Sequence, residues 1–191
     1  MKKSSVALII IFFFVLLDQI VKIWVKTSMS LGEYFPVLGN WLYIHFVENE
    51  GIAFGISFGE NIGKLLLSIL RIGVVGFLIY YLYAIIKKKR AEWEVVIILS
   101  LIIAGALGNI IDSIFYGVVW NYAPLLYGRV VDMFYFKLFM MPKWVPLWGG
   151  EYFFPAIFNV ADACTTIGIF AILVWNKKFF VSEKQEDKQY L

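Results

Sequence analysis

Apolar runs alternate with short charged or mixed segments along this chain. Four of these runs are long enough to cross about 30 Å of hydrocarbon as an α-helix, which takes about 20 residues. They are residues 5–25, 62–86, 94–114 and 155–175. The pattern therefore predicts an all-α membrane protein with four transmembrane helices in a single domain, residues 1–191.

The connection over residues 26–61 has a different pattern. Trp41 to Val47 is rich in aromatic and β-branched residues, which favours a short strand, and Asn49 to Gly51 indicates a turn. We therefore expect a small extracytoplasmic β-like element in this connection. Residues 115–154 are expected to form an interfacial loop, and the charged residues 182–191 to be disordered.

Composition supports a membrane protein and narrows the chemistry. Of the 191 residues, 61% are hydrophobic and 16% are charged, and the mean hydropathy is +0.79, too apolar for a water-soluble domain. One Cys and one His rule out a disulfide framework and leave little for a Cys/His metal site. We expect Cys164 to be a packing residue and His45 a structural one, and we expect no metal, cofactor or nucleic acid.

Basic residues at the ends of the runs predict an orientation. They lie at Lys2-Lys3, Lys87 to Arg90 and Lys177-Lys178. Because Lys and Arg accumulate on the cytoplasmic side, both termini are predicted to be cytoplasmic, with residues 26–61 and 115–154 outside. No small-residue cleavage site follows the first run, which favours an uncleaved first span over a removed signal peptide.

Polar residues interrupt three of the apolar runs. A carboxylate within a membrane-length segment costs roughly 2.5–3.5 kcal/mol on insertion scales, so such residues indicate functional groups with partners. The polar pairs are Asp18 with Lys22, Asn109 with Asp112, and Asn159 with Asp162. In both Asn-x-x-Asp pairs, the i, i+3 spacing on a helix would place the amide and the carboxylate on one face.

Two basic residues in the runs leave alternatives open. Lys22 with Asp18 forms either an ion pair that only allows the helix to insert, or one that also braces a functional region. Arg71 either extends toward the outer headgroups or is an electrostatic partner of the aspartates or of a substrate carbonyl.

The predicted topology places the aspartates at one depth. Asp18, Asp112 and Asp162 each lie within roughly 10 Å of the outer boundary at 1.5 Å per helical residue, and Asp132 in the outer connection can reach the same level. Two neighbouring carboxylates cannot both ionise, so one can activate water while the other, protonated, polarises a peptide carbonyl. This chemistry is that of an aspartic peptidase.

Three other functions would also use carboxylates in apolar segments or tolerate them there. Intramembrane carboxylates also relay protons in ion-coupled transporters, but those usually place their sites near the midplane. A hydrolase that uses Mg²⁺ would employ the same hard oxygen ligands, and chelation would test it. A purely structural subunit would leave the cost of the buried carboxylates uncompensated.

Five motifs in order resemble bacterial lipoprotein signal peptidase, the signal peptidase II family. The motifs are Asp18-x-x-x-Lys22, Asn49-x-Gly51-x-Ala53-Phe54-Gly55, Gly105-Ala106-Leu107-Gly108-Asn109-x-x-Asp112, Val130-Val131-Asp132 and Phe158-Asn159-x-Ala161-Asp162-Ala163. The resemblance implies a peptidase of the bacterial inner membrane that removes the signal peptide of diacylglyceryl-modified prolipoproteins immediately before the lipidated Cys.

The resemblance also implies the roles of individual residues. It makes Asp132 and Asp162 the catalytic pair, a choice that the spacing alone leaves open. The residues expected to support the site or the substrate are Asn49, Gly51, Asn109, Asp112, Asn159, Arg129, Asp18 and Lys22. Partners would be the prolipoprotein and membrane lipid, and we expect a monomer.

This sequence departs from the family in two ways. The family commonly has Arg directly after the third-span Asp, where this chain has Ser113, and Arg129 is a candidate replacement. The stretches Val118 to Tyr127 and Lys137 to Tyr152 lengthen the loops around Asp132, so the loop conformation over the site is not predicted.

Overall fold

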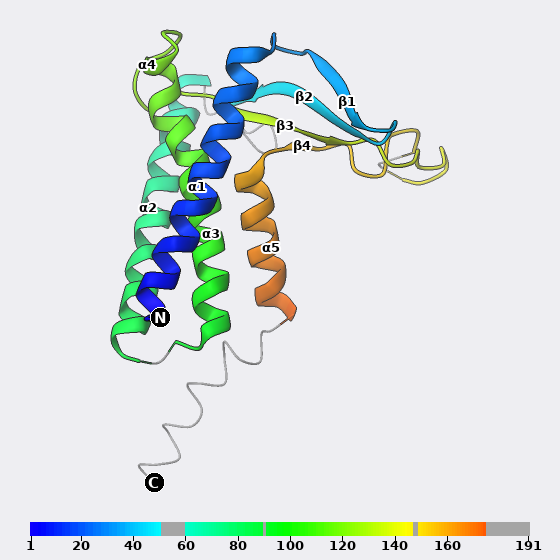
Figure 1. Cartoon of the computed structure of the whole chain (residues 1–191). Coiled ribbons are helices and arrows are strands. Elements are labelled where there is room, and N and C mark those ends of the chain that lie inside the picture. The colour runs from blue at the N-terminus through cyan, green and yellow to red at the C-terminus, as the bar shows by residue number, and fades with distance from the viewer. Residues whose placement is uncertain (51–59, 90, 147–148, 175–191) are drawn as a thin grey trace. The chain divides into compact units, whose positions relative to one another are not determined.

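The computed structural model describes residues 1–50, 60–89, 91–146 and 149–174 (Figure 1). The chain divides into two compact units. One consists of Met1–Leu17, Ser68–Ile111 and Val160–Leu191, and the other of Asp18–Leu67 and Asp112–Asn159. The predicted tail 182–191 and Gly51 lie outside the described residues.

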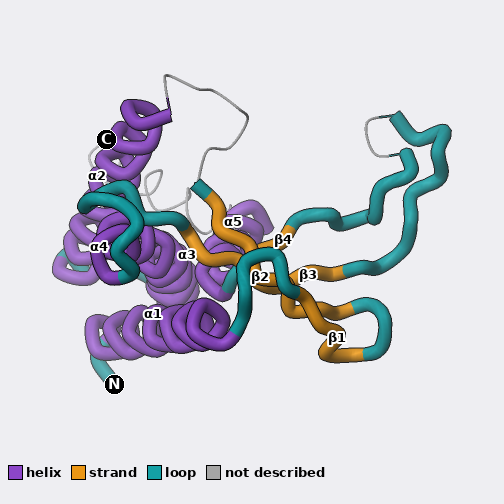
Figure 2. Tube along the Cα trace, turned by 90° about the horizontal axis from the view of Figure 1, so that it is seen from above, coloured by secondary structure: helices purple, strands orange, loops and turns teal. Residues whose placement is uncertain are grey.

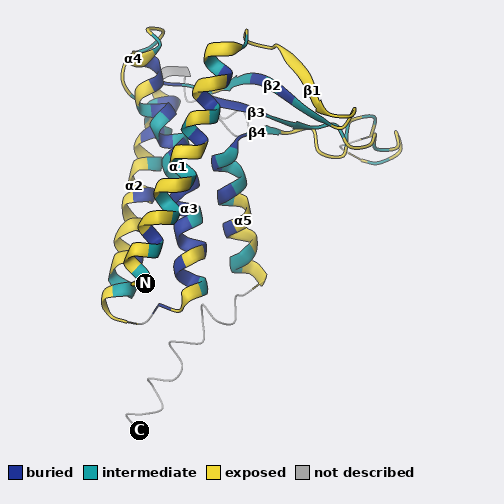
Figure 3. Ribbon diagram, viewed as in Figure 1, coloured by how far each residue is buried: buried dark blue, intermediate teal, exposed yellow. Residues whose placement is uncertain are grey.

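The first unit contains helices α3 (Trp93–Ile111) and α5 (Val160–Val174). It also contains the residues up to Leu17 of α1 (Lys3–Ser28) and those from Ser68 of α2 (Glu60–Lys87). Ala7 of α1, Leu82 of α2 and Ile103 of α3 belong to one buried apolar cluster. In Figure 3, α3 is dark blue along much of its length, whereas α1 and α2 show broad yellow surfaces. Those exposed surfaces include large apolar side chains such as Phe12 and Phe77, and lipid is the solvent that suits them.

Three helical segments are long and apolar enough to cross a membrane: Lys3–Ser28, Ile62–Lys87 and Trp93–Val119. They coincide with the first three predicted spans. Over the described residues, the fourth apolar helix is the shorter Val160–Val174.

The predicted helical start at Pro155 is wrong, because the helix begins five residues later. Ile157–Phe158 instead forms strand β4, which pairs with Phe134 and Tyr135 of another strand. Asn159, a residue type favoured at helix N-caps, directly precedes α5. Asn159 and Asp162 therefore do not share a helix face in the predicted way, since only Asp162 is inside the helix.

Helices α3 and α5 approach closely because α3 has glycine at the contact. A Cβ added at Gly105 would collide with the Ala161 carbonyl oxygen and the Thr165 hydroxyl of α5. A larger side chain would push the helices apart. This close approach lies one helical turn from Asn109 on α3 and next to Asp162 on α5.

The second unit contains a four-stranded antiparallel sheet in the order β1-β2-β3-β4 (Figure 2). Its strands are Tyr34–Leu38, Leu42–Asn49, Val130–Phe136 and Ile157–Phe158. Strand β2 confirms the strand predicted from Trp41. His45 lies in it with its ring near Tyr34 and Tyr135, at 5.5 and 6.1 Å between centroids, as expected for a structural residue.

Strand β3 was not predicted, since residues 115–154 were expected to form a loop. Its sequence is a short apolar run, and such a run does not distinguish a strand from other buried structure without its partner. The partner is β2, more than 80 residues earlier, where Val47 pairs with Asp132 and Asn49 with Val130.

Beyond α3 the chain forms a π-helical turn, η2 (Asp112–Tyr116), and a short helix, α4 (Gly117–Val119). It then folds back so that the Gly128 N–H donates to the Ser113 carbonyl at 2.9 Å. A Cβ on Gly128 would collide with the Asp112 carbonyl oxygen. This close approach places the start of β3 beside Asp112, and π-helical turns of this kind are frequent at functional sites.

Candidate active site

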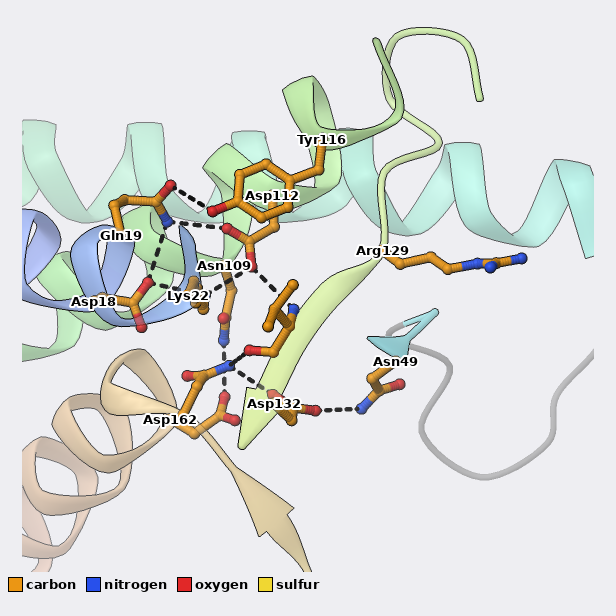
Figure 4. Close-up of polar contacts among 12 residues, drawn as sticks. Asp18, Gln19, Lys22, Asn49, Asn109, Asp112, Tyr116, Arg129, Asp132 and Asp162 are labelled. Atoms are coloured by element: carbon orange, nitrogen blue, oxygen red, sulfur yellow. Dashed lines mark hydrogen bonds and ion pairs between the residues drawn. The ribbon is translucent and has the colours of Figure 1, made fainter. Parts of the chain in front are cut away.

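Asp132 is buried in β3 and accepts hydrogen bonds from two asparagine amides. The Asn159 Nδ2 donates to its Oδ1 at 2.6 Å, and the Asn49 Nδ2 donates to its Oδ2 at 3.3 Å (Figure 4). The strand register brings Asn49 there, since β2 ends at this residue and runs antiparallel to β3. Both oxygens of this carboxylate are therefore held in place by uncharged donors.

Asn159 is itself fully buried and also contacts the β3 backbone. Its Nδ2 lies 3.3 Å from the Val131 carbonyl oxygen, to which it donates. One side chain thus ties the carboxylate of Asp132 to the main chain next to it. Asn159 lies between β4, which ends at Phe158, and α5, which begins at Val160. Its amide is therefore held where the strand ends and the helix begins.

Asp162 lies in the first turn of α5. The Asn109 Nδ2 of α3 donates to its Oδ1 at 2.7 Å (Figure 4). A carboxylate in the first helical turn also interacts favourably with the positive end of the helix dipole. Asp162, like Asp132, is thus hydrogen-bonded to an asparagine side chain.

Asp112 belongs to a different kind of group, because its partner is an ammonium. The Lys22 Nζ lies 2.8 Å from Asp112 Oδ2 and 2.8 Å from Asp18 Oδ2, and all three side chains are at most 1% exposed. The ion pair predicted between Asp18 and Lys22 is therefore present, and it includes Asp112 as well. The pair therefore does more than neutralise charge within α1, because Lys22 also holds Asp112 at the start of η2.

Two residues that the sequence analysis overlooked complete this group. The Gln19 Nε2 donates to Asp112 Oδ1 at 2.9 Å, and its Oε1 accepts from the Tyr116 hydroxyl at 3.1 Å. The Val131 N–H donates to Asp112 Oδ2 at 3.2 Å, which ties η2 to β3. Gln19, a polar residue beside Asp18 in an apolar run, was a detectable signal for this role.

Arg129 does not take the place of the expected Arg beside Asp112. Its guanidinium pairs with Glu50 at 3.3 Å and Glu48 at 3.5 Å and is 42% exposed. Glu48 also pairs with Lys26 of α1. Arg129 therefore joins the start of β3 to the end of β2, while Lys22 supplies the positive charge at Asp112.

The remaining predicted residues are placed as follows. Cys164 is buried in α5, which agrees with the role of a packing residue. Arg71 lies partly exposed in α2. Over the described ranges, which omit residues 51–59, 90, 147–148 and 175–191, no group of three or more His, Cys, Asp or Glu residues is arranged to hold a metal ion.

The fold and the polar groups together define a class of protein. Helices of membrane-spanning length carry the buried Asp18 and Asp112. Two further aspartates, Asp132 in β3 and Asp162 in the shorter α5, accept hydrogen bonds from asparagine amides. These features are typical of a membrane protein with a functional polar site, and they fit a membrane hydrolase of the aspartate type.

Comparison with known proteins agrees with this class. The family model described as signal peptidase (SPase) II matches residues 10–178. A lipoprotein signal peptidase of Porphyromonas gingivalis is 45% identical over 191 aligned residues, with 90% of this chain and 83% of the relative covered. A lipoprotein signal peptidase of Amoebophilus asiaticus is 37% identical, with 88% and 76% covered.

Solved structures agree as well. A bacterial membrane enzyme determined by the in meso method at 2.3 Å is 29% identical, with a TM-score of 0.65 and coverage of 92% of this chain and 90% of that one. A second, determined by the same method, is 30% identical with a TM-score of 0.64. The chain therefore belongs to the signal peptidase II family of aspartic peptidases, which confirms the resemblance drawn from the five motifs.

Proposed function

We propose that this protein is a membrane aspartic endopeptidase that removes the signal peptide of diacylglyceryl-modified prolipoproteins immediately before the lipidated cysteine. Family membership supports this activity, as does the name lipoprotein signal peptidase shared by its relatives. The proposal extends to the catalytic residues, the depth of the site and the topology of the chain.

Asp132 and Asp162 are proposed to form the catalytic pair. The observation that carries this assignment is the 2.6 Å hydrogen bond from Asn159 to Asp132, because Asp162 follows Asn159 by only three residues. Three residues of chain span at most about 11 Å. The hydrogen bond holds Asn159 at the Asp132 carboxylate. It therefore limits how far the Asp162 carboxylate can lie from that of Asp132.

The reaction follows from one ionised and one protonated carboxylate. The ionised carboxylate takes a proton from water as the water oxygen attacks the scissile carbonyl carbon, and the other carboxyl group donates its proton to the carbonyl oxygen. The tetrahedral intermediate then collapses. The first carboxyl group gives the proton it took from water to the peptide nitrogen of the lipidated cysteine as the C–N bond breaks. The second carboxylate regains its proton from a hydroxyl of the intermediate, and no covalent enzyme intermediate forms.

Asparagine is suited to support such a pair. Its amide can donate from the NH₂ group to a carboxylate and can accept at the carbonyl oxygen from a carboxylic acid. Asn49, Asn109 and Asn159 can therefore stay hydrogen-bonded while protons move. We assign Asp112, Asp18 and Lys22 to the support of β3, Arg129 to the join between β2 and β3, and Gly51 to the substrate side.

The substrate explains a site near the outer boundary of the membrane. The diacylglyceryl chains anchor the substrate cysteine at the interface, so aspartates within roughly 10 Å of that boundary meet the scissile bond where the lipid holds it. We propose four spans in the bacterial inner membrane, with both termini cytoplasmic and the enzyme acting as a monomer. The three helices of spanning length support this topology.

Reporter fusions test the topology. Fusions after residues 90 and 178 should be active in the cytoplasm, and fusions within 26–61 or 115–154 should be active outside. A fusion after residue 90 that reports from the outside would reverse the orientation and place the aspartates at the wrong leaflet.

Mass spectrometry of a purified, lipid-modified prolipoprotein incubated with the protein tests the function directly. The expected product begins at the lipidated cysteine, and activity should persist in EDTA. The matched controls are the unlipidated precursor and the Asp162→Asn variant. A cut at another bond would contradict the proposed specificity, and a requirement for divalent metal would favour the Mg²⁺ mechanism instead.

A further inference from the structure

The second unit contains a cavity of about 520 Å³ that the proposed reaction does not use. Its lining residues are Glu50, Lys64, Tyr122, Ala123, Pro124, Tyr127 and Arg129. Neither Asp132 nor the side chains that hold it are among these described lining residues. The cavity therefore differs from the site at which the peptide bond is proposed to be cut.

The lining combines two cations with phenols. Lys64 is 7% exposed, although it lies near the start of α2, and the Arg129 guanidinium is partly exposed. The two basic side chains outnumber the one carboxylate of the described lining, Glu50, so the lining favours an anionic ligand. An arginine fork suits phosphate oxygens in particular.

Tyr122 is fixed in place as part of this lining. Its hydroxyl oxygen accepts from the Arg129 N–H at 2.7 Å, and its ring lies 5.6 Å from the Arg129 guanidinium and 5.1 Å from the Lys26 ammonium. Burial raises the pKa of the Tyr122 hydroxyl. The phenol therefore keeps its proton at neutral pH and is available as a hydrogen-bond donor.

The position of Lys64 along α2 indicates where the ligand comes from. Lys64 is the third residue of the apolar segment Ile62–Lys87, at the end opposite the basic residues Lys87 to Lys89. The first residues of a membrane-spanning helix lie at the level of the lipid headgroups, where tyrosine is also enriched. Phosphate esters of lipids are concentrated at this level.

We propose that this cavity binds the phosphodiester headgroup of a membrane phospholipid. Lys64 and Arg129 contact the phosphate, and the Tyr122 hydroxyl donates a third hydrogen bond. Glu50, which already pairs with Arg129, accepts from the hydroxyl or ammonium group of the headgroup. Basic pockets beside membrane helices bind headgroups in this way.

Native mass spectrometry of the full-length protein in detergent tests the proposal without any measurement of cleavage. The probes are phosphatidylglycerol, phosphatidylethanolamine, a diacylglycerol with the same acyl chains, and inorganic phosphate as a competitor. Wild-type protein should retain both phospholipids. Diacylglycerol lacks the phosphate, so any that is held at a site for the substrate's diacylglyceryl group should be unaffected by substitutions in the cavity. Lys64→Gln should weaken phospholipid binding about tenfold, the size expected for one charge-assisted hydrogen bond.

Lys143→Gln is the matched control, since Lys143 is exposed and does not line the cavity. Arg129→Gln provides a second test on an exposed side chain in case Lys64→Gln destabilises the fold, which thermal unfolding will reveal. Equal loss of phospholipid and diacylglycerol in the cavity variants would overturn the proposal, as would equal phospholipid binding by all three variants. Displacement of phospholipid by millimolar inorganic phosphate would assign the cavity to a free anion instead. None of these outcomes depends on the proposed peptidase activity.

Discussion

Asp112 and Asp132 are both buried carboxylates of the second unit, yet their surroundings differ in one chemical respect. Asp112 faces the Lys22 ammonium, and the carbonyl of its Gln19 partner is engaged by Tyr116. Asp132 faces the amides of Asn49 and Asn159. An ammonium can only donate hydrogen bonds, whereas an asparagine amide both donates and accepts.

On the proposed assignment, this difference separates a structural carboxylate, Asp112, from one that exchanges protons, Asp132. The lysine ammonium stabilises the carboxylate anion more than the neutral acid, so protonation of Asp112 would lose the ion pair that compensates Lys22. The amides suit either protonation state, as general acid/base catalysis requires. The residue type of the hydrogen-bonding partner thus provides a physical criterion for sorting several buried aspartates by role.

The largest expected effect comes from the amide-held aspartates. Asp132→Asn and Asp162→Asn keep size and hydrogen bonding but remove the base or the shared proton, so each should fold and lose turnover by at least about 10³-fold. Their effects should not add, because the two act as one unit. The measurement is peptide cleavage with thermal unfolding on both single variants and the double variant. Near-normal turnover by Asp162→Asn would remove the dyad.

The second effect is on stability. Lys22→Met leaves Asp18 and Asp112 buried side by side without their cation, which should cost about 3–5 kcal/mol of unfolding free energy. Denaturant unfolding in detergent measures this loss. The triple variant Asp18→Asn, Lys22→Met, Asp112→Asn should recover much of it, since it has no buried charge. A triple variant no more stable than Lys22→Met would contradict the ion-pair explanation.

Asp112→Asn sharpens the comparison. The amide oxygen can still accept from the Val131 N–H, but it cannot pair with Lys22 as a charge, so we expect a stability loss of about 1–3 kcal/mol with partial activity. Activity and melting temperature should be measured on the same preparation. The comparison fails if this variant is as inactive as Asp132→Asn while its stability is unchanged, because Asp112 would then behave as a catalytic residue.

The smallest effect is expected for Asn49→Ala. It removes the longer of the two bonds to Asp132, 3.3 Å against 2.6 Å from Asn159, and Asn49 is exposed. We expect turnover to fall about five- to tenfold, the equivalent of one modest hydrogen bond, with little change in melting temperature. Asn159→Ala is the matched variant and should lose more of both quantities. Equal losses of stability and turnover in Asn49→Ala would reduce Asn49 to a structural residue.

The sequence by itself determined the membrane class, three of the helices and the polar residues of interest. Apolar length is a local property of the chain, so the runs at 5–25, 62–86 and 94–114 predicted helices α1, α2 and α3 without knowledge of any partner. The cost of a carboxylate in such a run likewise singled out Asp18, Asp112 and Asp162. The ordered motifs were sufficient to identify the family.

Only the tertiary structure decided which polar groups are partners. The i, i+3 spacing predicted that Asn109 would lie beside Asp112 and Asn159 beside Asp162. Instead, Asn109 donates to Asp162 and Asn159 donates to Asp132, across 53 and 27 residues of chain. The physical reason is that both predicted pairs fall at helix ends. Asp112 begins η2 and accepts from the Val131 N–H of β3, and Asn159 follows β4, which pairs with β3, before α5 begins. Strand β3 gains its ladder hydrogen bonds by pairing with β2, more than 80 residues earlier, and with β4, and no local pattern of the sequence encodes such distant pairing.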